Sequence, residues 1–261
     1  MLSNFYLYST LSSSPETLSY PLIAASTTVA SQAAAQLSEQ ITNETAKVAA
    51  YDEMLAAVTG FQNTLAGFDF SDEASATAAA QDFVDGYNAL ASTIKELTGA
   101  GGVLKGDTTA TLLVSSLQNK LSAAFPAAGS FDRLYQLGIT PQTDGTLALD
   151  TDTFATAYAA DAAGVDSLLT ETASTFDALV DPYTTGGGII ESTAGVYGDN
   201  LLDLKMALPA LESMGAQTQS YANAQYASAQ YASAVYRLYS TSLTENLYAS
   251  FAANSSMSFF A

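Results

Sequence analysis

The sequence contains no cysteine, no histidine and no tryptophan, and only seven lysine and arginine residues against 26 aspartate and glutamate residues. The missing thiol and imidazole groups exclude Cys–His and Ser–His–Asp nucleophiles, and also a tetrahedral zinc site built from the usual ligands. Disulfide bonds are excluded as well, so an extracellular protein of this composition depends on packing and assembly. We therefore predict that the chain is not an enzyme and holds no cofactor or metal; only an uncommon Ser/Asp/Lys site would change that.

The scarcity of positive charge and of long apolar runs excludes two classes of partner. The formal net charge of −19 repels phosphate backbones and anionic lipid surfaces. No stretch approaches the roughly 18–20 apolar residues that a membrane span requires. The first 30 residues carry Glu16 but no lysine or arginine, so they lack the positive region of a Sec signal. Their serine and threonine content predicts a disordered N-terminal arm over residues 1–30.

Residues 31–68 have the pattern of a coiled-coil helix. Apolar side chains recur at steps of 3, 4 and 7 residues, at Leu37, Ile41, Val48, Tyr51, Leu55, Val58 and Leu65. Glu44 and Gln62 occupy the two positions that the seven-residue steps skip. A polar residue in such a seam costs stability but can fix the register, so we expect this helix to pair with specific partner helices.

Residues 74–215 are predicted to form a helical core domain with a small β-turn–helix part. One helix spans residues 74–97, and Asp107 caps another that runs to about residue 125. Short strands near 137–149 flank the turn Thr143-Asp144-Gly145. Asp150 caps a short helix, Asp161 caps a second over 162–169, and a further helical turn at 175–179 stops before Pro182.

A long helix is predicted from Ile189, with a kink or an early break at Pro209. Its apolar edge consists of Leu201, Leu204, Leu208 and Leu211. A five-residue repeat then places tyrosines at 221, 226 and 231, about 140° apart around a helix. Two interpretations stay open, namely compositional drift and a helix contacted from several sides. The apolar edge resumes at Tyr236, Tyr239, Leu243, Leu247 and Phe251, so residues 216–261 are predicted to be a C-terminal assembly helix and tail.

The acidic residues give no pattern of a reactive site. Asp144, Asp150 and Asp152 do not match the spacing of a calcium-binding loop, and turns or helix caps account for them better. Asp161 and Asp166 are expected to be a cap and a solvated acid.

Four stretches in series resemble one protein family. They are the sequence from Gln81 to Thr98, the block Gly106–Leu113, the run Leu137–Asp150 with its "LGIT" and "DGTL" segments, and Asp181-Pro182-Tyr183 with Gly186–Ile189. In this order they resemble the C-terminal conserved region of flagellar hook-associated protein 2, the filament-capping family. Residues 36–68 resemble its N-terminal coiled-coil region less sharply. The family places globular head domains between these regions, whereas here only residues 69–80 separate them, as in a short form.

The resemblance implies a mainly α protein, with long N- and C-terminal helices that form a coiled-coil or bundle rod around the small β-turn–helix part. It implies export through the flagellar type III apparatus without a Sec signal, and an extracellular place in the bacterial flagellum. Its expected partners are further copies of itself, flagellin, the hook-junction proteins and an export chaperone at the C-terminal region. In the family the oligomer caps the filament and aids flagellin insertion.

The terminal helices are the predicted assembly interface. Its residues are Leu37, Ile41, Tyr51, Leu55, Val58, Leu65, Leu201, Leu204, Leu208, Leu211, Tyr236, Leu243, Leu247 and Phe251. Two alternatives to a filament cap stay open. One is a filament or hook–filament junction subunit, since a rod without a head stacks more readily. The other is a secreted adhesin that binds through its tyrosine-rich surface.

Overall fold

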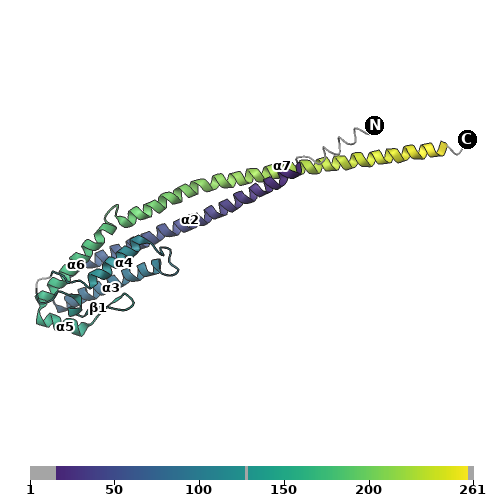
Figure 1. The fold of residues 1–261 in the computed structure, drawn as a ribbon. Coiled ribbons are helices and arrows are strands. Elements are labelled where there is room, and N and C mark those ends of the chain that lie inside the picture. The colour runs from purple at the N-terminus through teal and green to yellow at the C-terminus, as the bar shows by residue number, and fades with distance from the viewer. Residues whose placement is uncertain (1–15, 127–128, 258–261) are drawn as a thin grey trace. The chain divides into compact units, whose positions relative to one another are not determined.

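The computed structural model describes the backbone of residues 16–126 and 129–257, and the side chains of residues 28–126 and 129–245. In chain order its elements are α2 (Glu16–Ala66), α3 (Glu73–Thr98), α4 (Thr108–Leu121), the 3₁₀ helix η1 (Leu134–Leu137), β1 (Ile139–Pro141), β2 (Leu147–Leu149), α5 (Thr151–Ala160), α6 (Ala162–Thr184) and α7 (Ile189–Met257) (Figure 1). The predicted mainly α class is confirmed.

These elements form two compact units. The helical core unit comprises residues 40–203, and the terminal unit comprises residues 1–39 together with residues 204–261. Helices α2 and α7 contribute one part to each unit, because the divisions fall inside them. The four segments predicted from the sequence divide the chain at other positions and stay a prediction.

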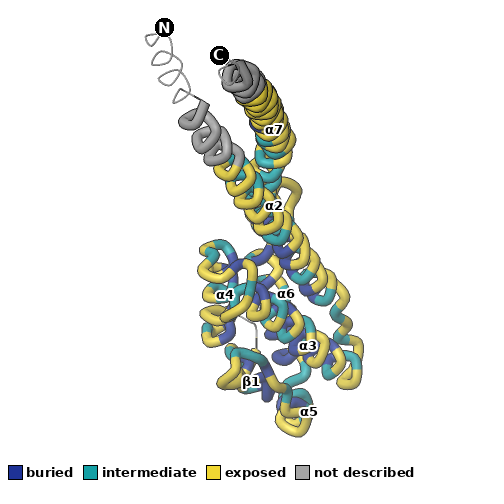
Figure 2. The backbone as a smooth tube through the Cα atoms, turned by 90° about the vertical axis from the view of Figure 1, so that its right-hand side faces the viewer, coloured by how far each residue is buried: buried dark blue, intermediate teal, exposed yellow. Residues whose placement is uncertain are grey.

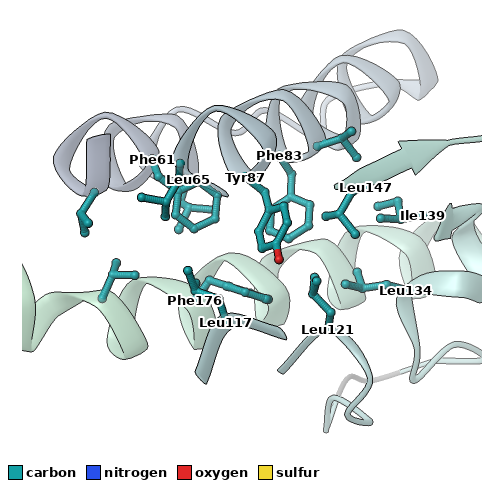
Figure 3. Close-up of a cluster of buried hydrophobic side chains, with 14 of the residues drawn as sticks. Phe61, Leu65, Phe83, Tyr87, Leu117, Leu121, Leu134, Ile139, Leu147 and Phe176 are labelled. Carbon is teal, nitrogen blue, oxygen red and sulfur yellow. The ribbon is translucent and has the colours of Figure 1, made fainter. Parts of the chain in front are cut away.

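The helical core unit is built around a cluster of aromatic rings. The ring of Phe83 in α3 lies 5.3 Å from that of Phe176 in α6, and Phe61 of α2 lies 6.0 Å and 6.1 Å from these two, between ring centroids. Leu117 and Leu121 of α4 close the cluster (Figure 3). Burial of each such side chain stabilises the fold by about 1.5–3 kcal/mol. The cluster therefore fixes four helices to one another.

The periodicity of α3 explains its place in this core. Its buried positions include the predicted row Phe83, Tyr87, Leu90, Ile94 and Leu97, at alternating steps of four and three residues. Such steps keep the side chains on one edge of a helix. Buried positions of the core unit lie where its helices face one another (Figure 2), so the row predicted from the sequence is confirmed.

Aspartates start four of the helices. Asp72, Asp107, Asp150 and Asp161 each accept a hydrogen bond from a backbone N–H in the first turn of the helix that follows. These bonds satisfy N–H groups that have no partner within the helix. Hydrogen bonds from backbone N–H groups lower the pKa of Asp72, Asp150 and Asp161, with Gly164 the largest contributor for Asp161. The predicted caps at 107, 150 and 161 are confirmed.

The two short strands form an antiparallel hairpin in which Ile139 pairs with Leu149 and Pro141 with Leu147. In its turn the carboxylate of Asp144 accepts hydrogen bonds from the backbone N and the hydroxyl of Thr146, at 3.0 and 2.6 Å. Gly145 adopts a φ of +90°, which a side chain would strain. The predicted hairpin is confirmed.

Asn88 of α3 holds this hairpin to the helix. Its side-chain Nδ2 donates to the carbonyl oxygen of Leu147 at 2.9 Å, and its Oδ1 accepts from the backbone N of Leu147 at 2.6 Å. The amide side chain thus pairs with a strand as another strand would. Both backbone groups are partly buried, so they need these partners.

Three expectations differ from the structure. Helix α2 begins at Glu16, so helix replaces the predicted disorder over residues 16–30, a stretch without glycine; residues 1–15 lie outside the described part of the chain. Helix α6 runs unbroken from Ala162 to Thr184, where two separate short helices were predicted. The residues between the two predicted helices, 170–174, include no glycine or proline, and Pro182 lies in the last turn of α6, where little helix follows.

Helix α7 also continues through Pro209, so of the predicted kink or early break the early break is wrong. A proline inside a helix removes one backbone hydrogen bond. Leu208 and Leu211 on either side of it are half-buried, so the loss is offset by packing.

The Asn88 bridge gives a first testable prediction. Asn88→Ala leaves the backbone N and O of Leu147 without partners, and we expect it to lower the free energy of unfolding by about 2–3 kcal/mol. Chemical denaturation measures this. The matched control is Gln81→Ala on the exposed side of α3, where the amide bonds only Asp85; a change of about 0.5 kcal/mol or less is expected there. Equal losses in both variants would contradict the bridge.

A second prediction concerns Asp166 of α6, which is not the solvated acid expected from the sequence. Its Oδ1 is buried without a hydrogen-bond partner in the described part of the chain, and burial raises its pKa above the usual 3.8. A carboxyl whose pKa is raised by folding destabilises the folded state once the pH exceeds its pKa. We expect Asp166→Asn to stabilise the protein by about 1 kcal/mol at pH 7.

This gain should shrink as the pH falls through the raised pKa toward the unfolded value, because the wild-type carboxyl is then protonated. Thermal unfolding from about pH 3 to pH 7 measures the trend. The control is Asp82→Asn, an exposed acid on α3. A gain that does not depend on pH would contradict the assignment to the Asp166 carboxylate.

Candidate assembly surface

In the terminal unit, helix α7 carries a row of side chains at steps of four and three residues. The row consists of Leu204, Leu208, Leu211, Gly215, Thr218 and Ala222, and all of them are buried or half-buried. This spacing is that of a coiled-coil seam, in which one edge of a helix faces a partner helix. The predicted leucine edge is therefore the beginning of a longer seam.

The partner of this seam in the terminal unit is the first part of α2. A Cβ atom placed on Gly215 would lie 3.6 Å from the Cβ of Ala30, which is an ordinary van der Waals contact. Ala33, Ala34 and Leu37 of α2 are half-buried as well. Small side chains on both helices let the two backbones approach closely.

The same seam continues along α7 into a stretch where it is exposed. After Ala222 the steps of three and four residues lead through Gln225, Ala229 and Ala232 to the three large apolar residues Tyr236, Tyr239 and Leu243. Tyr236 is 73% exposed, Tyr239 is 69% exposed and Leu243 is 60% exposed (Figure 2). Large apolar side chains in a contiguous exposed row mark an interaction site.

This part of α7 also lacks charge. No aspartate, glutamate, lysine or arginine occurs between Glu212 and Arg237. The rest of the chain is strongly acidic, so the uncharged segment is where a second acidic chain meets the least repulsion. Tyr221 and Tyr231 of the five-residue repeat lie in it with more than half of their surface exposed.

The α2 seam in the helical core unit is already occupied. Tyr51 is fully buried, its ring stacks on that of Tyr197 in α7 with a centroid distance of 5.6 Å, and its hydroxyl donates to Oδ2 of Asp107 at 2.5 Å. Burial, followed by the hydrogen bond to Asp107, raises the pKa of Tyr51. Tyr51 thereby links α2, α7 and the cap of α4.

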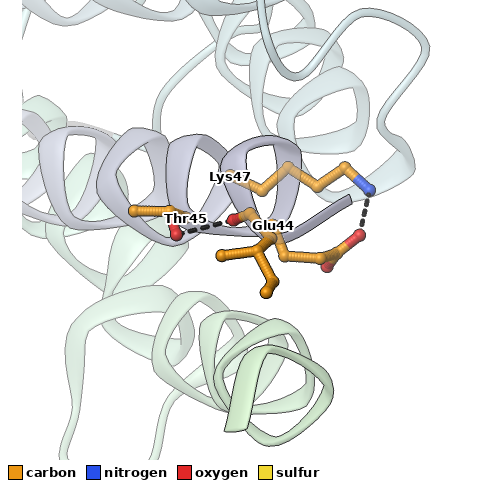
Figure 4. A network of polar contacts seen from close by, with 4 residues as sticks. Glu44, Thr45 and Lys47 are labelled. Atoms are coloured by element: carbon orange, nitrogen blue, oxygen red, sulfur yellow. Dashed lines mark hydrogen bonds and ion pairs between the residues drawn. The ribbon is translucent and has the colours of Figure 1, made fainter. Parts of the chain in front are cut away.

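The two polar seam residues of α2, Gln62 and Glu44, differ in how many of their side-chain polar atoms have hydrogen-bond partners. Gln62 donates to Asp177 at 3.1 Å and accepts from the Thr184 hydroxyl at 2.5 Å, both on α6. Glu44 forms a 3.0 Å ion pair with Lys47 through Oε1 (Figure 4), while its Oε2 is buried without a partner among the described residues. The Lys47 ammonium lies 4.7 Å from the centre of the Tyr197 ring. The unpaired oxygen of Glu44 therefore makes this residue more destabilising to the fold than Gln62, whose amide groups both have partners.

The residues predicted as an assembly interface fall into four groups. Tyr51, Val58 and Leu65 are buried in the helical core unit, where they pack within their own chain. The half-buried group is Leu37, Ile41, Leu55, Leu201, Leu204, Leu208 and Leu211. Tyr236 and Leu243 are exposed. Leu247 and Phe251 lie outside the residues whose side chains are described, so the candidate surface rests on the exposed members.

Some exposed apolar residues were missing from the predicted interface. Tyr239 belongs to the seam, and its spacing from Tyr236 and Leu243 was the available signal. Tyr231 and Leu238 lie seven residues apart on another edge of α7, and both are more than two-thirds exposed. Their spacing was also present in the sequence, but their exposure could be learned only from the structure.

The described residues offer no arrangement for metal chemistry, since no group of three or more acidic side chains gathers among them. Asp144, Asp150 and Asp152 lie in the hairpin turn and at the start of α5, in the places predicted for turn and cap residues. Within the same part of the chain, no helix combines the length and the apolarity needed to cross a membrane.

The unpaired oxygen of Glu44 gives a third prediction. Glu44→Leu removes a buried carboxylate from the seam and adds an apolar contact, so we expect the free energy of unfolding to rise by about 1 kcal/mol. Glu53→Leu, on the exposed side of the same helix, is the control and should change it by about 0.5 kcal/mol or less. Destabilisation by Glu44→Leu would show that the ion pair with Lys47 outweighs the unpaired oxygen.

Comparison with known proteins places the chain in a family. The family described as flagellar hook-associated protein 2 C-terminus matches residues 70–234. Flagellar hook-associated protein 2 of Aeromonas caviae is 27% identical over 168 residues, which cover 59% of this chain and 36% of that protein. The B-type flagellar hook-associated protein 2 of Pseudomonas aeruginosa is 29% identical over 189 residues, or 67% of this chain and 40% of that protein. The Escherichia coli O157:H7 protein of the same name is 33% identical over 112 residues, 38% and 24% of the two chains.

The crystal structure of the flagellar cap protein FliD D1-D2-D3 domains from Escherichia coli is also similar, with 31% identity and a TM-score of 0.45 over 48% of this chain and 37% of that one. The chain spans between 24% and 40% of the length of the three relatives named above. Since the family match covers well over half of its residues, the chain belongs to the flagellar hook-associated protein 2 family.

Proposed function

We propose that this protein is a self-assembling axial protein of the bacterial flagellum, which acts like a filament cap and aids flagellin assembly at the filament tip. Its family membership supports this role, since the relatives carry the name flagellar hook-associated protein 2. The role is structural, and no catalytic step is assigned to any of its residues.

The observation that carries the proposal is the exposed continuation of the α7 seam. Tyr236, Tyr239 and Leu243 keep the phase of the half-buried row that precedes them, so this edge has the geometry of a helix-pairing surface. Other copies of the protein are the proposed partners at this edge. Flagellin and the hook-junction proteins are proposed as neighbours in the axial structure, with an export chaperone on the C-terminal region before assembly.

The energies of burial and of association show why a row of exposed residues is needed to hold two copies together. A fully buried leucine or tyrosine contributes about 1.5–3 kcal/mol, whereas association costs at least about 4 kcal/mol in lost freedom of motion. One side chain cannot hold two copies together, whereas three buried side chains together contribute about 4.5–9 kcal/mol, which exceeds the lower end of that cost. The proposed location is extracellular, at the flagellum, with export that does not use a Sec signal.

A fourth prediction tests the proposal. The triple variant Tyr236→Ser, Tyr239→Ser, Leu243→Ser removes the exposed apolar seam and leaves the net charge unchanged. We expect the wild-type chain to form a discrete oligomer and the variant to be monomeric, as measured by size-exclusion chromatography with light scattering. Electron microscopy should show wild-type protein at the ends of flagellin filaments, and the variant should be absent from them.

The matched control is Met206→Ser with Met214→Ser, which removes two α7 side chains of similar exposure from outside the seam. This control should assemble like the wild type. Circular dichroism must show the same helix content in all three proteins. A wild-type chain that stays monomeric and binds neither flagellin nor filament ends would refute the proposed function.

A further inference from the structure

The far end of the α7 seam has no partner helix in the part of the chain that the structure describes. Up to Ala222 the seam residues of α7 are buried or half-buried, whereas Tyr236, Tyr239 and Leu243 on the same edge are exposed. A contiguous row of large apolar side chains is unfavourable in water, so a free chain gains stability when something covers it.

The register between α2 and α7 shows which residues can cover this row. In the helical core unit the Lys47 ammonium lies over the ring of Tyr197, and in the terminal unit Ala30 lies opposite Gly215. Between these contacts α2 goes back 17 residues, from 47 to 30, while α7 goes forward 18, from 197 to 215. The two helices therefore run antiparallel, and the numbers of paired residues keep a nearly constant sum, which is 245 for Ala30 and Gly215.

In this register the residues before α2 reach the exposed row. Glu16, where α2 begins, falls opposite the seam position Ala229. The 15 residues that precede Glu16 lie outside the described part of the chain. As a helix they would span about 22 Å, and Leu243 lies about 21 Å beyond Ala229 along α7 at the same rise per residue. The segment is therefore long enough to cover the whole row.

The side chains of this segment also fit the row. The register pairs Leu2 with Leu243, Tyr6 with Tyr239 and the small Ser9 with Tyr236. Positions 2, 6 and 9 are separated by steps of four and three residues, so they share one edge of a helix. Residues 1–15 contain no charged side chain, and they bring no acid to the row in a chain of net charge −19.

Pro15 lies between this segment and α2, and a proline inside a helix removes one backbone hydrogen bond. Helix α7 shows that this chain tolerates such a residue, since it continues through Pro209. The proline therefore does not prevent the segment from following the course of α2.

Tethering favours the segment of the same chain over that of a second copy. A tethered segment acts at an effective concentration on the order of millimolar, which a second copy reaches only in a concentrated solution. Pairing within the chain also continues the contact that the first part of α2 already makes with α7.

We propose that residues 1–15 continue α2 and cover the exposed row of α7 in the free chain, so that a second copy must displace them to assemble. The contact rests on the register of α2 and α7. Its role as a shield rests on the proposed function, because it assumes that copies meet at Tyr236, Tyr239 and Leu243.

Cross-linking tests the contact, because the chain has no cysteine of its own. In the full-length variant Leu2→Cys with Leu243→Cys, oxidised glutathione should form a disulfide within one chain, seen as a faster-migrating monomer on a non-reducing gel. A disulfide needs Cβ atoms about 3.5–4.5 Å apart, so its formation reports the register. The matched control is Leu2→Cys with Thr241→Cys, on the opposite side of α7, which should give about tenfold less cross-linked chain.

The protein concentration needed for assembly tests the shield. Leu2→Ser with Tyr6→Ser removes two covering side chains from the full-length protein, so it should assemble at about tenfold lower concentration than the wild type, as measured by light scattering. The control Leu7→Ser with Leu11→Ser removes two apolar side chains from the other side of the same segment, and should assemble at the wild-type concentration. Circular dichroism should show equal helix content in these two variants.

The outcomes separate this inference from the proposed function. Disulfides that link two chains, or no disulfide at all, would overturn the contact. A disulfide within one chain, together with Leu2/Tyr6 variants that assemble at the wild-type concentration or need more protein, would overturn the shield and leave the proposed function standing. A chain that stays monomeric in every variant would refute the proposed function and the shield with it, whereas the disulfide would still establish the contact.

Discussion

The alternation of three- and four-residue steps along α7 is the constraint on which the rest of the structure depends. It keeps Leu204, Leu208 and Leu211 on one edge, and it places Tyr236 and Leu243 on the same edge further on. The first part of the edge is half-buried within the chain, whereas the second is exposed. One periodic pattern thus runs through the packed and the exposed parts of the helix, because a helix cannot change the direction of its seam without breaking the spacing.

Charge distinguishes the segment of α7 between Glu212 and Arg237, which has no charged residues, from the acidic remainder of the chain. A chain with a net charge of −19 repels its own copies, so contact between copies is favoured only where acids are absent. The segment between Glu212 and Arg237 meets this condition with alanine, serine, glutamine and tyrosine. Its tyrosines lie at five-residue steps, so they face several directions. Such a distribution is what the interpretation of a helix contacted from several sides requires, and compositional drift stays the alternative interpretation.

Local features of this fold could be predicted from the sequence, and long-range ones could not. Asp107, Asp150 and Asp161 were identified as caps, because a cap bonds to residues only two or three positions away. The continuity of α6 was missed, since its polar stretch around Thr172 resembles a loop in composition. The bridge between Asn88 and the hairpin could not be predicted, because it joins residues that are 59 positions apart in the sequence. Exposure of the seam likewise depends on which residues of other elements cover it.

The two polar residues in the α2 seam differ in whether they fix the register between helices in return for the stability that a polar seam residue costs. Both partners of Gln62 lie on α6, more than 100 residues away in sequence, so its hydrogen bonds form only when α2 and α6 are aligned in this one register. A shift by one step would leave its half-buried amide without these partners. Glu44 does not fix the register in this way, since its ion-pair partner Lys47 is on its own helix. Register in the helical core unit is therefore fixed near Gln62 and the aromatic cluster around Phe61, and the seam becomes less specific toward Glu44.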